Sequence, residues 1–202
     1  MNQYPAIAGI ENRSVASGIR CADAMAKQAP ISVMKAGTVH NGKYLILIGG
    51  SVAAVEEAYQ AGLSVTDDYL VDCVLLPDAH DQVRNALLGT RQLCSEESLG
   101  ILETITVATL IKAVDAGIKG TDVQLLELRL ADDLGGKAVA FINGRIEEVE
   151  AAISIARSSV KDEQFWFTDQ IIPRLNEDVA NQLNHSSHFA EIQLQQMQGG
   201  EI

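Results

Sequence analysis

The chain has 202 residues, 47% hydrophobic and 21% charged, and its 15 Lys and Arg against 27 Asp and Glu leave a net charge of −12. This acidity removes the basic patch that nucleic acids require, so we expect no nucleic-acid partner. No apolar run approaches the roughly 18 residues of a membrane-spanning helix, and no signal peptide is recognisable, so we expect neither membrane insertion nor secretion. Three scattered cysteines (Cys21, Cys73 and Cys94) are typical of reduced cytoplasmic thiols.

The first elements of the chain are predicted to be a strand and a helix. Ala6 to Ile10 is a short apolar run typical of a buried strand. Ser14 stands at the N-cap position of a helix, where its hydroxyl can accept from the first free amides. Small residues dominate this helix, so it can pack closely against a sheet. The apolar residues that share one face at helical spacing are Val15, Ile19, Ala22 and Ala26.

Two paired strands, a second helix, a fourth strand and a third helix complete the first half. The paired strands are expected at residues 31–34 and 44–48, joined by a polar loop. Ser51 caps the second helix, which is expected to stop at Gly62. The fourth strand and the start of the last helix are expected at residues 70–76 and at Pro77-Asp78.

The second half of the chain repeats the first in three blocks with offsets of 92, 94 and 96 residues. Between the blocks only loop lengths change, which indicates a duplicated domain rather than a solenoid, whose repeats run to roughly 20–50 residues. Matching residues include Glu11 and Glu103, Ile19 and Ile111, Asp23 and Asp115, Lys27 and Lys119, Gly42-Lys43 and Gly136-Lys137, Val55 and Val149, Pro77 and Pro173, and Val83 and Val179.

These elements predict an α+β fold, in which each copy forms an antiparallel four-stranded sheet covered by helices. We place the first domain at 1–92, the second at 93–184 and a flexible C-terminal tail at 185–202. The two copies differ mainly in charge, because residues 1–92 carry a net −2 and residues 93–202 a net −10.

Signatures of catalysis are missing from the sequence. The glycines around Ser51 lack the spacing of a nucleophile elbow, and Gly135-Gly136-Lys137 lacks the remaining residues of a phosphate-binding loop. The four histidines and scattered carboxylates form no evident acid–base pair. We therefore expect a structural or binding protein rather than an enzyme.

Both copies resemble the bacterial microcompartment (BMC) shell domain. The resemblance rests on a G-x-x-E start (A-x-x-E in the first copy), a helical A-D-A-x-x-K or V-D-A-x-x-K motif, a Gly-Lys pair after a loop, and a strand that ends in L-P or I-P. It implies a tandem-domain shell protein of the trimeric type, in which three chains form a pseudohexameric tile. It also implies other microcompartment shell proteins and encapsulated enzymes as partners, a cytoplasmic location, and a central pore for small metabolites.

The resemblance also assigns residues to the pore and to the tile edge. In the family, the loops before the two Gly-Lys pairs line the central opening, and edge positions pack against a neighbouring tile. The implied pore-lining residues are Thr38, Val39, His40, Asn41 and Gly42 in the first copy and Asp132, Asp133, Leu134 and Gly135 in the second. The implied edge residues are Lys27, Lys119, Asp78 and Arg174.

His40 decides what the resemblance implies about a cofactor. A tandem-domain relative, that of propanediol-utilisation compartments, holds an iron–sulfur cluster at its threefold axis through a Cys of this loop, and here His40 takes that position. Neutral imidazoles are weaker donors to such clusters than thiolates, so we expect no cofactor. The alternative is a redox or metal-binding module, in which three His40 side chains hold an ion at the axis.

Overall fold

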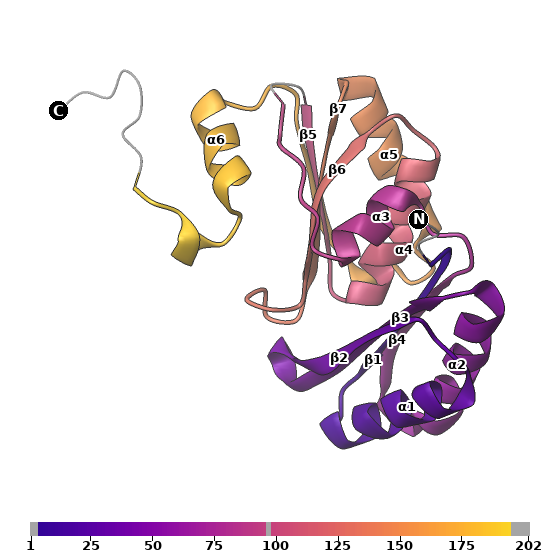
Figure 1. Cartoon of the computed structure of the whole chain (residues 1–202). Helices are drawn as coiled ribbons and strands as arrows, with labels where there is room; N and C mark the ends of the chain where they lie inside the picture. Colours follow the sequence, from indigo (N-terminus) through magenta and orange to yellow (C-terminus); the bar gives the residue numbers. More distant parts are fainter. Residues whose placement is uncertain (1–3, 96–97, 195–202) are drawn as a thin grey trace.

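The computed structural model describes residues 4–95 and 98–194, which form two domains of the same architecture (Figure 1). Along the described residues, the helices are too short or too polar to traverse a lipid bilayer. The first domain consists of β1 (Ala6–Asn12), α1 (Val15–Gln28), β2 (Val33–Val39), β3 (Lys43–Gly50), α2 (Val52–Val65), β4 (Leu70–Leu76) and α3 (Asp81–Leu87). The second consists of β5 (Ser98–Thr104), α4 (Val107–Lys119), β6 (Gln124–Leu130), β7 (Ala138–Gly144), α5 (Ile146–Ser159), β8 (Trp166–Ile172) and α6 (Glu177–His185).

The two sheets have the same antiparallel topology, which confirms the predicted fold class. Their strand orders are β2-β3-β1-β4 and β6-β7-β5-β8. One irregularity repeats, since the register with the last strand shifts after Glu11 in one sheet and after Glu103 in the other. A second shift, between Leu125 and Glu127 of β6, has no counterpart in the β2–β3 pair. The matching register means that residues at equivalent sequence positions occupy equivalent places in the two domains.

Two helices cover one face of each sheet, and their contact explains one incorrect boundary. Gly62 was expected to end the second helix, but α2 continues to Val65. A Cβ at Gly62 would lie 2.7 Å from Cγ of Met25 and 2.8 Å from Cδ1 of Ile10. Gly62 is therefore required for close packing of α2 against α1 and β1 rather than for termination.

The buried face of α1 differs from the predicted one. Ser14 caps the helix as expected, accepting from the amide of Ser17 at 3.3 Å. However, Val15, Ile19 and Ala26 lie at the surface, where Ile19 is 53% exposed. The residues that pack inward are Ser17, Gly18, Cys21, Ala22 and Met25.

The equivalent helix of the second domain, α4, is buried much more completely. Val107, Leu110 and Ile111 are 0% exposed, and they belong to a core cluster that also contains Ile7 and Val74 of the first domain. Helix α4 packs against its own sheet and against β4 of the first domain. The two domains therefore share one apolar core where α4 meets the first sheet.

The chain beyond α6 is partly packed against the second domain. Ser186 is 2% exposed, and the backbone oxygen of Ser187 accepts from the Arg129 guanidinium at 3.0 Å. A short 3-10 turn covers Phe189–Glu191. The predicted tail thus begins as an ordered segment held on β6, and its last residues, 195–202, lie outside the described part of the chain.

Candidate functional site at the junction of the domains

A buried ion pair joins the first domain to two elements of the second. The Lys43 ammonium lies 2.7 Å from Oε2 of Glu11 and donates to the backbone oxygen of Gly136, also at 2.7 Å. The other oxygen of Glu11 accepts from the amide of Ala108 at 2.8 Å, in the first turn of α4. A carboxylate at this end of a helix meets free amides and the positive end of the helix dipole.

Burial controls the protonation of this pair. Glu11 and Lys43 are 0% and 5% exposed. Desolvation raises the pKa of Glu11 above its ordinary value of 4.5, although Lys43 and the Ala108 amide oppose that rise. A buried charge of this kind is tolerated only while its partners remain in place.

A second set of polar contacts follows the same boundary. The Asp72 carboxylate, on β4, accepts from the hydroxyls of Thr106 and Thr109 at the start of α4. Thr106 occupies the N-cap position of α4 but makes no capping bond, and it directs its hydroxyl to Asp72 instead. At the far end of α4, Asp115 accepts from the His80 amide at 2.7 Å.

The predicted edge residues lie around this boundary and at its repeat positions. The Lys119 ammonium donates to the backbone oxygen of Asp78 and pairs with Asp115 at 2.6 Å, while its side chain remains 40% exposed. The equivalent pair, Lys27 with Asp23, is exposed on α1 at the same 2.6 Å. Asp78 and Arg174 follow the prolines that end β4 and β8, and both are exposed. Lys119 therefore already serves a contact between the domains, whereas Lys27 contacts only its own helix among the described residues.

The two predicted pore loops meet beside the Glu11–Lys43 pair. The His40 ring Nδ1 accepts from the amide of Asp133 at 3.1 Å and lies 3.4 Å from Oδ1 of Asp132. Gly136, at φ +83, approaches this loop so closely that a Cβ there would lie 3.1 Å from the His40 backbone oxygen. The structure thus brings the loops of the two copies together.

The other predicted pore residues divide between strand ends and exposed turns. Thr38 and Val39 end β2 rather than belonging to the loop. Asn41 and Asp133 adopt left-handed backbone angles, φ 66° and 60°, which Asn and Asp tolerate well. The exposed members of the two loops are His40, Asn41, Gly42, Asp132, Asp133 and Gly135, while Leu134 is half-buried.

The chain's thiols do not fit an iron–sulfur cluster at this junction. Cys21 and Cys94 are buried in hydrophobic clusters, and Cys73 lies on β4. Burial raises the pKa of Cys21 to about 11 and also raises that of Cys94, so neither provides the thiolate that a cluster binds. Within residues 4–95 and 98–194, no group of three or more His, Cys, Asp and Glu is arranged to hold a metal ion.

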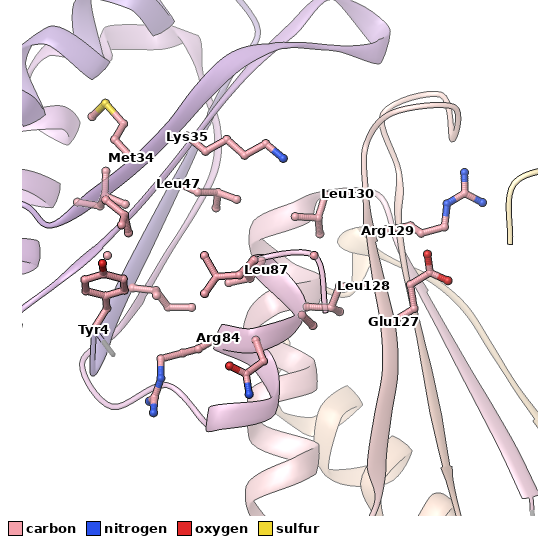
Figure 2. A pocket seen from close by; sticks show the side chains of 18 of the residues that line it. Tyr4, Met34, Lys35, Leu47, Arg84, Leu87, Glu127, Leu128, Arg129 and Leu130 are labelled. Carbon is pink, nitrogen blue, oxygen red and sulfur yellow. The ribbon is translucent and has the colours of Figure 1, made fainter. Parts of the chain in front are cut away.

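An apolar groove of about 600 Å³ runs between the outer face of the first sheet, α3 and β6 (Figure 2). Leu47 projects into it from β3, and Leu128 and Leu130 from β6. Glu127 and Arg129 alternate with these leucines and project toward the opposite side of β6. The groove lies on the face of the first sheet away from α1 and α2.

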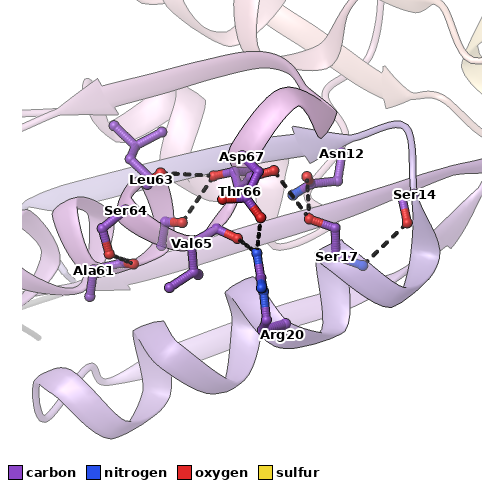
Figure 3. A network of polar contacts seen from close by, with 11 residues as sticks. Asn12, Ser14, Ser17, Arg20, Ala61, Leu63, Ser64, Val65, Thr66 and Asp67 are labelled. Atoms are coloured by element: carbon purple, nitrogen blue, oxygen red, sulfur yellow. Dashed lines mark hydrogen bonds and ion pairs between the residues drawn. The ribbon is translucent and has the colours of Figure 1, made fainter.

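Helix α1 is held by polar contacts to the end of β1 and to the end of α2 (Figure 3). The Ser17 hydroxyl lies 3.4 Å from Oδ1 of Asn12 and 3.3 Å from the backbone oxygen of Thr66. Arg20 binds Asp67 and the backbone oxygen of Val65, the last residue of α2. These contacts orient α1 without using Val15 or Ile19.

Sequence reasoning noticed the key residues of the junction but assigned them no role. Glu11 and Lys43 were matched to Glu103 and Lys137 in the repeat, and only the fold shows that they form an ion pair. Asp72 was missed altogether, because its counterpart at the repeat position is Thr168. The signal that could have found the pair was the repetition of a Glu and a Gly-Lys in both copies.

Known proteins share this two-domain arrangement. The model of the BMC domain matches residues 6–79 and again residues 98–175. PduT, a bacterial microcompartment shell protein of Citrobacter freundii, is 33% identical over 178 residues, which cover 88% of this chain and 97% of PduT. CcmO, a carboxysome assembly protein of Synechocystis, is 24% identical over 90% of this chain and 65% of its own length.

Solved structures agree with the sequence comparisons. A microcompartment protein of Desulfitobacterium hafniense superimposes with a TM-score of 0.77 at 32% identity, over 87% of this chain and 98% of its own. The match of one domain model to both halves, together with the identity to PduT along most of the chain, leads to one conclusion. The chain belongs to the BMC domain family and carries two copies of the domain in tandem.

Proposed function

We propose that this chain is a structural subunit of a bacterial microcompartment shell, and that three copies close head to tail into a pseudohexameric tile. PduT, which matches it over most of its length, is itself a microcompartment shell protein. In this proposal the tile packs with other shell proteins in the cytoplasm, encloses enzymes, and passes small metabolites through a central opening. One observation carries the trimer: the contacts between the two domains have unused counterparts on the outer faces of the chain.

Apolar counterparts differ in burial according to which domain carries them. Val107 and Ile111 on α4 are 0% exposed, whereas Val15 and Ile19 at the same positions of α1 are 37% and 53% exposed. For the last helix of each domain the order is reversed: Val83 on α3 is 0% exposed, whereas its counterpart Val179 on α6 is 43% exposed. A second copy that places its α1 where α4 lies within the chain would cover these side chains.

The polar counterpart of the Glu11–Lys43 pair, on the second domain, also lacks some of the partners that the first pair has. Lys137 lies 2.6 Å from Glu103, as Lys43 does from Glu11, but the two side chains are 32% and 27% exposed. Among the described residues, Glu103 receives no amide from a helix start of the kind that Ala108 gives to Glu11. By the repeat, that amide would come from Ala16 of the next copy.

Head-to-tail contacts of this kind close into a ring when the rotation between units returns to its start. Duplication makes every second contact a covalently linked one, so three chains give six domains around one axis. The paired loops of each chain would then alternate around the opening, His40 with Asp132 and Asp133. Such an opening is polar and rich in carboxylates, and His40 adds an imidazole to it.

The trimer is tested by light scattering coupled to gel filtration. The parent should elute as a species of about three times the 21.7 kDa chain mass. The Ile19→Asp variant should remain folded and become monomeric, because a charge would be buried at the contact with the next copy. Gln60→Asp is the matched control, since Gln60 and its counterpart Ser154 are both exposed and lie on the second helix of each domain. A parent that is monomeric at micromolar concentration would refute the tile.

A further inference from the structure

The outer faces of the two sheets are covered to different extents. On the second sheet, Leu99 and Phe141 pack with Cys94 and with Leu183 of α6, and the remaining cavity is only about 10 Å³. On the first sheet, the same positions are Ile7 and Leu47, and they line the groove of about 600 Å³. The second sheet is covered because a further segment of the chain crosses its outer face, whereas the described residues place no such segment on the first sheet.

The segment that joins the domains covers the second sheet. After α3, the Gln92 amide donates to the backbone oxygen of Leu126 at 2.9 Å. The Arg91 guanidinium binds the backbone oxygen of Leu183 at 2.8 Å, and the Cys94 amide donates to Asn184 at 2.6 Å. The chain that leaves the last helix of one domain therefore crosses to the next domain and lies between its sheet and its own last helix.

We infer that the chain that leaves α6 does the same in the ring, so that residues 189–202 of one protomer occupy the groove on the first domain of the next. This inference rests on the head-to-tail trimer proposed above. The occupant of the groove is then the C-terminal segment of a second copy.

The composition of the segment suits the groove. Phe189 and Leu194 are 94% and 105% exposed, although both are large apolar residues that gain from burial. From residue 186 to 202 the sequence contains two acidic residues, Glu191 and Glu201, and no Lys or Arg. The groove is lined by leucines, and its charged lining residues are Lys35, Arg84 and Arg129 against Glu127 and Asp132. Lys35 and Arg84 lie at the end of the groove formed by the first domain, where a segment with apolar side chains and no cation of its own can pack.

The segment begins beside the groove of its own chain, which His188 also lines. Ser187 is held by Arg129, and His188 Nδ1 lies 3.6 Å from Oδ2 of Asp133, beside the paired loops. Fourteen residues follow from Phe189, and they can extend over roughly 45 Å. Because the joining segment crosses to the neighbouring domain rather than returning to its own, we assign the same course to the C-terminal segment.

Disulfide trapping distinguishes a C-terminal segment that binds the groove of the next protomer from one that binds the groove of its own chain. Met34 lines the groove and is 38% exposed, so it offers one end of the crosslink. The double variant Met34→Cys with Leu194→Cys is purified as the trimer and oxidised. Crosslinks between chains, visible as dimers and trimers on a non-reducing gel, are expected. The parent, with its three native cysteines, and each single variant provide the controls and should remain monomeric on the gel. A crosslink within one chain, or none in a protein that is trimeric by light scattering, would overturn the inference and leave the tile intact.

A second measurement does not depend on trapping. The double variant Phe189→Asp with Leu194→Asp should still form the trimer, but the trimer should dissociate at a concentration at least about 10-fold higher than for the parent. Gln193→Asp adds charge between the two apolar positions and should leave the dissociation unchanged. Equal dissociation of the double variant and the parent would count against the segment as the occupant. A parent that never trimerises would remove both the tile and this contact.

Discussion

Replacing Lys43 with methionine removes the only ammonium that faces the buried Glu11 carboxylate among the described residues. Glu11 is 0% exposed and would retain a single partner, the Ala108 amide. It could avoid a bare buried charge only by binding a proton. At pH 7, about 2.5 pH units above the ordinary carboxyl value of 4.5, this costs roughly 3 kcal/mol, at about 1.36 kcal/mol per unit. Removing one partner of a buried pair costs a similar amount in other proteins, about 3–5 kcal/mol.

The loss is measured by urea denaturation followed by circular dichroism. With a slope of about 2 kcal/mol per molar, the midpoint of Lys43→Met should fall by roughly 1.5 M at pH 7. The deficit should shrink as the pH falls toward 4.5, because the proton that Glu11 must bind becomes easier to acquire. The double variant Glu11→Gln with Lys43→Met, which leaves no charge to bury, should recover most of the stability.

Lys137→Met provides the matched control at the repeat position. Its partner Glu103 is 27% exposed and can be hydrated, so the loss should stay below about 1 kcal/mol. Both lysine variants are compared in the Ile19→Asp background, in which the trimer is not expected to form and Lys137 stays accessible. Equal losses at the two positions would refute the argument that burial, rather than pairing alone, makes the Glu11–Lys43 contact important.

Two further predictions concern the same boundary. Because burial raises the pKa of Glu11, its contribution to stability is fully present below 4.5 and is lost as the pH rises through the raised value. Urea unfolding at pH 4.5 and pH 7 should therefore show a larger decrease in stability for the parent than for Glu11→Gln, and the opposite order would mean that Lys43 dominates. Lys27→Asp should leave the trimer intact but prevent its incorporation into sheets or shells, observed by electron microscopy. Lys119→Asp is a poorer test, because it places a second carboxylate beside the buried Asp115, and normal sheets from Lys27→Asp would remove Lys27 from the tile edge.

Most strands were predictable because they show their own pattern, but the strand expected at 31–34 is wrong in its bounds, since β2 runs over Val33–Val39 and includes residues expected in a polar loop. Residues 70–76 were assigned as a strand with the observed bounds, and the repeat made each assignment in one half a check on the other. The resemblance of the loops before the two Gly-Lys pairs also identified two segments that the fold brings together. Local patterns therefore sufficed for the elements and their order.

The face of α1 and the role of Gly62 could not be read locally. Val15 and Ile19 have the spacing of a core-facing stripe, but the surface that they fit is not the sheet of their own domain. Gly62 has the appearance of a helix end, and only the position of Met25 reveals it as a packing contact. Glu11 and Lys43, 32 residues apart, form a pair only because two elements of another domain enclose them. In each case the deciding partner lies far away in the chain.

The segment that joins α3 to β5 has a consequence for how a shell subunit accumulates in a cell. It holds the two domains at a high effective concentration, so their shared core forms at any expression level. Ring formation then depends on a lower power of chain concentration than it would for six separate domains. The covalent contacts can also tolerate substitutions that the contacts between chains cannot, because they need not compete with dilution. Sequence drift should therefore be freer at the internal boundary than at the boundaries between chains.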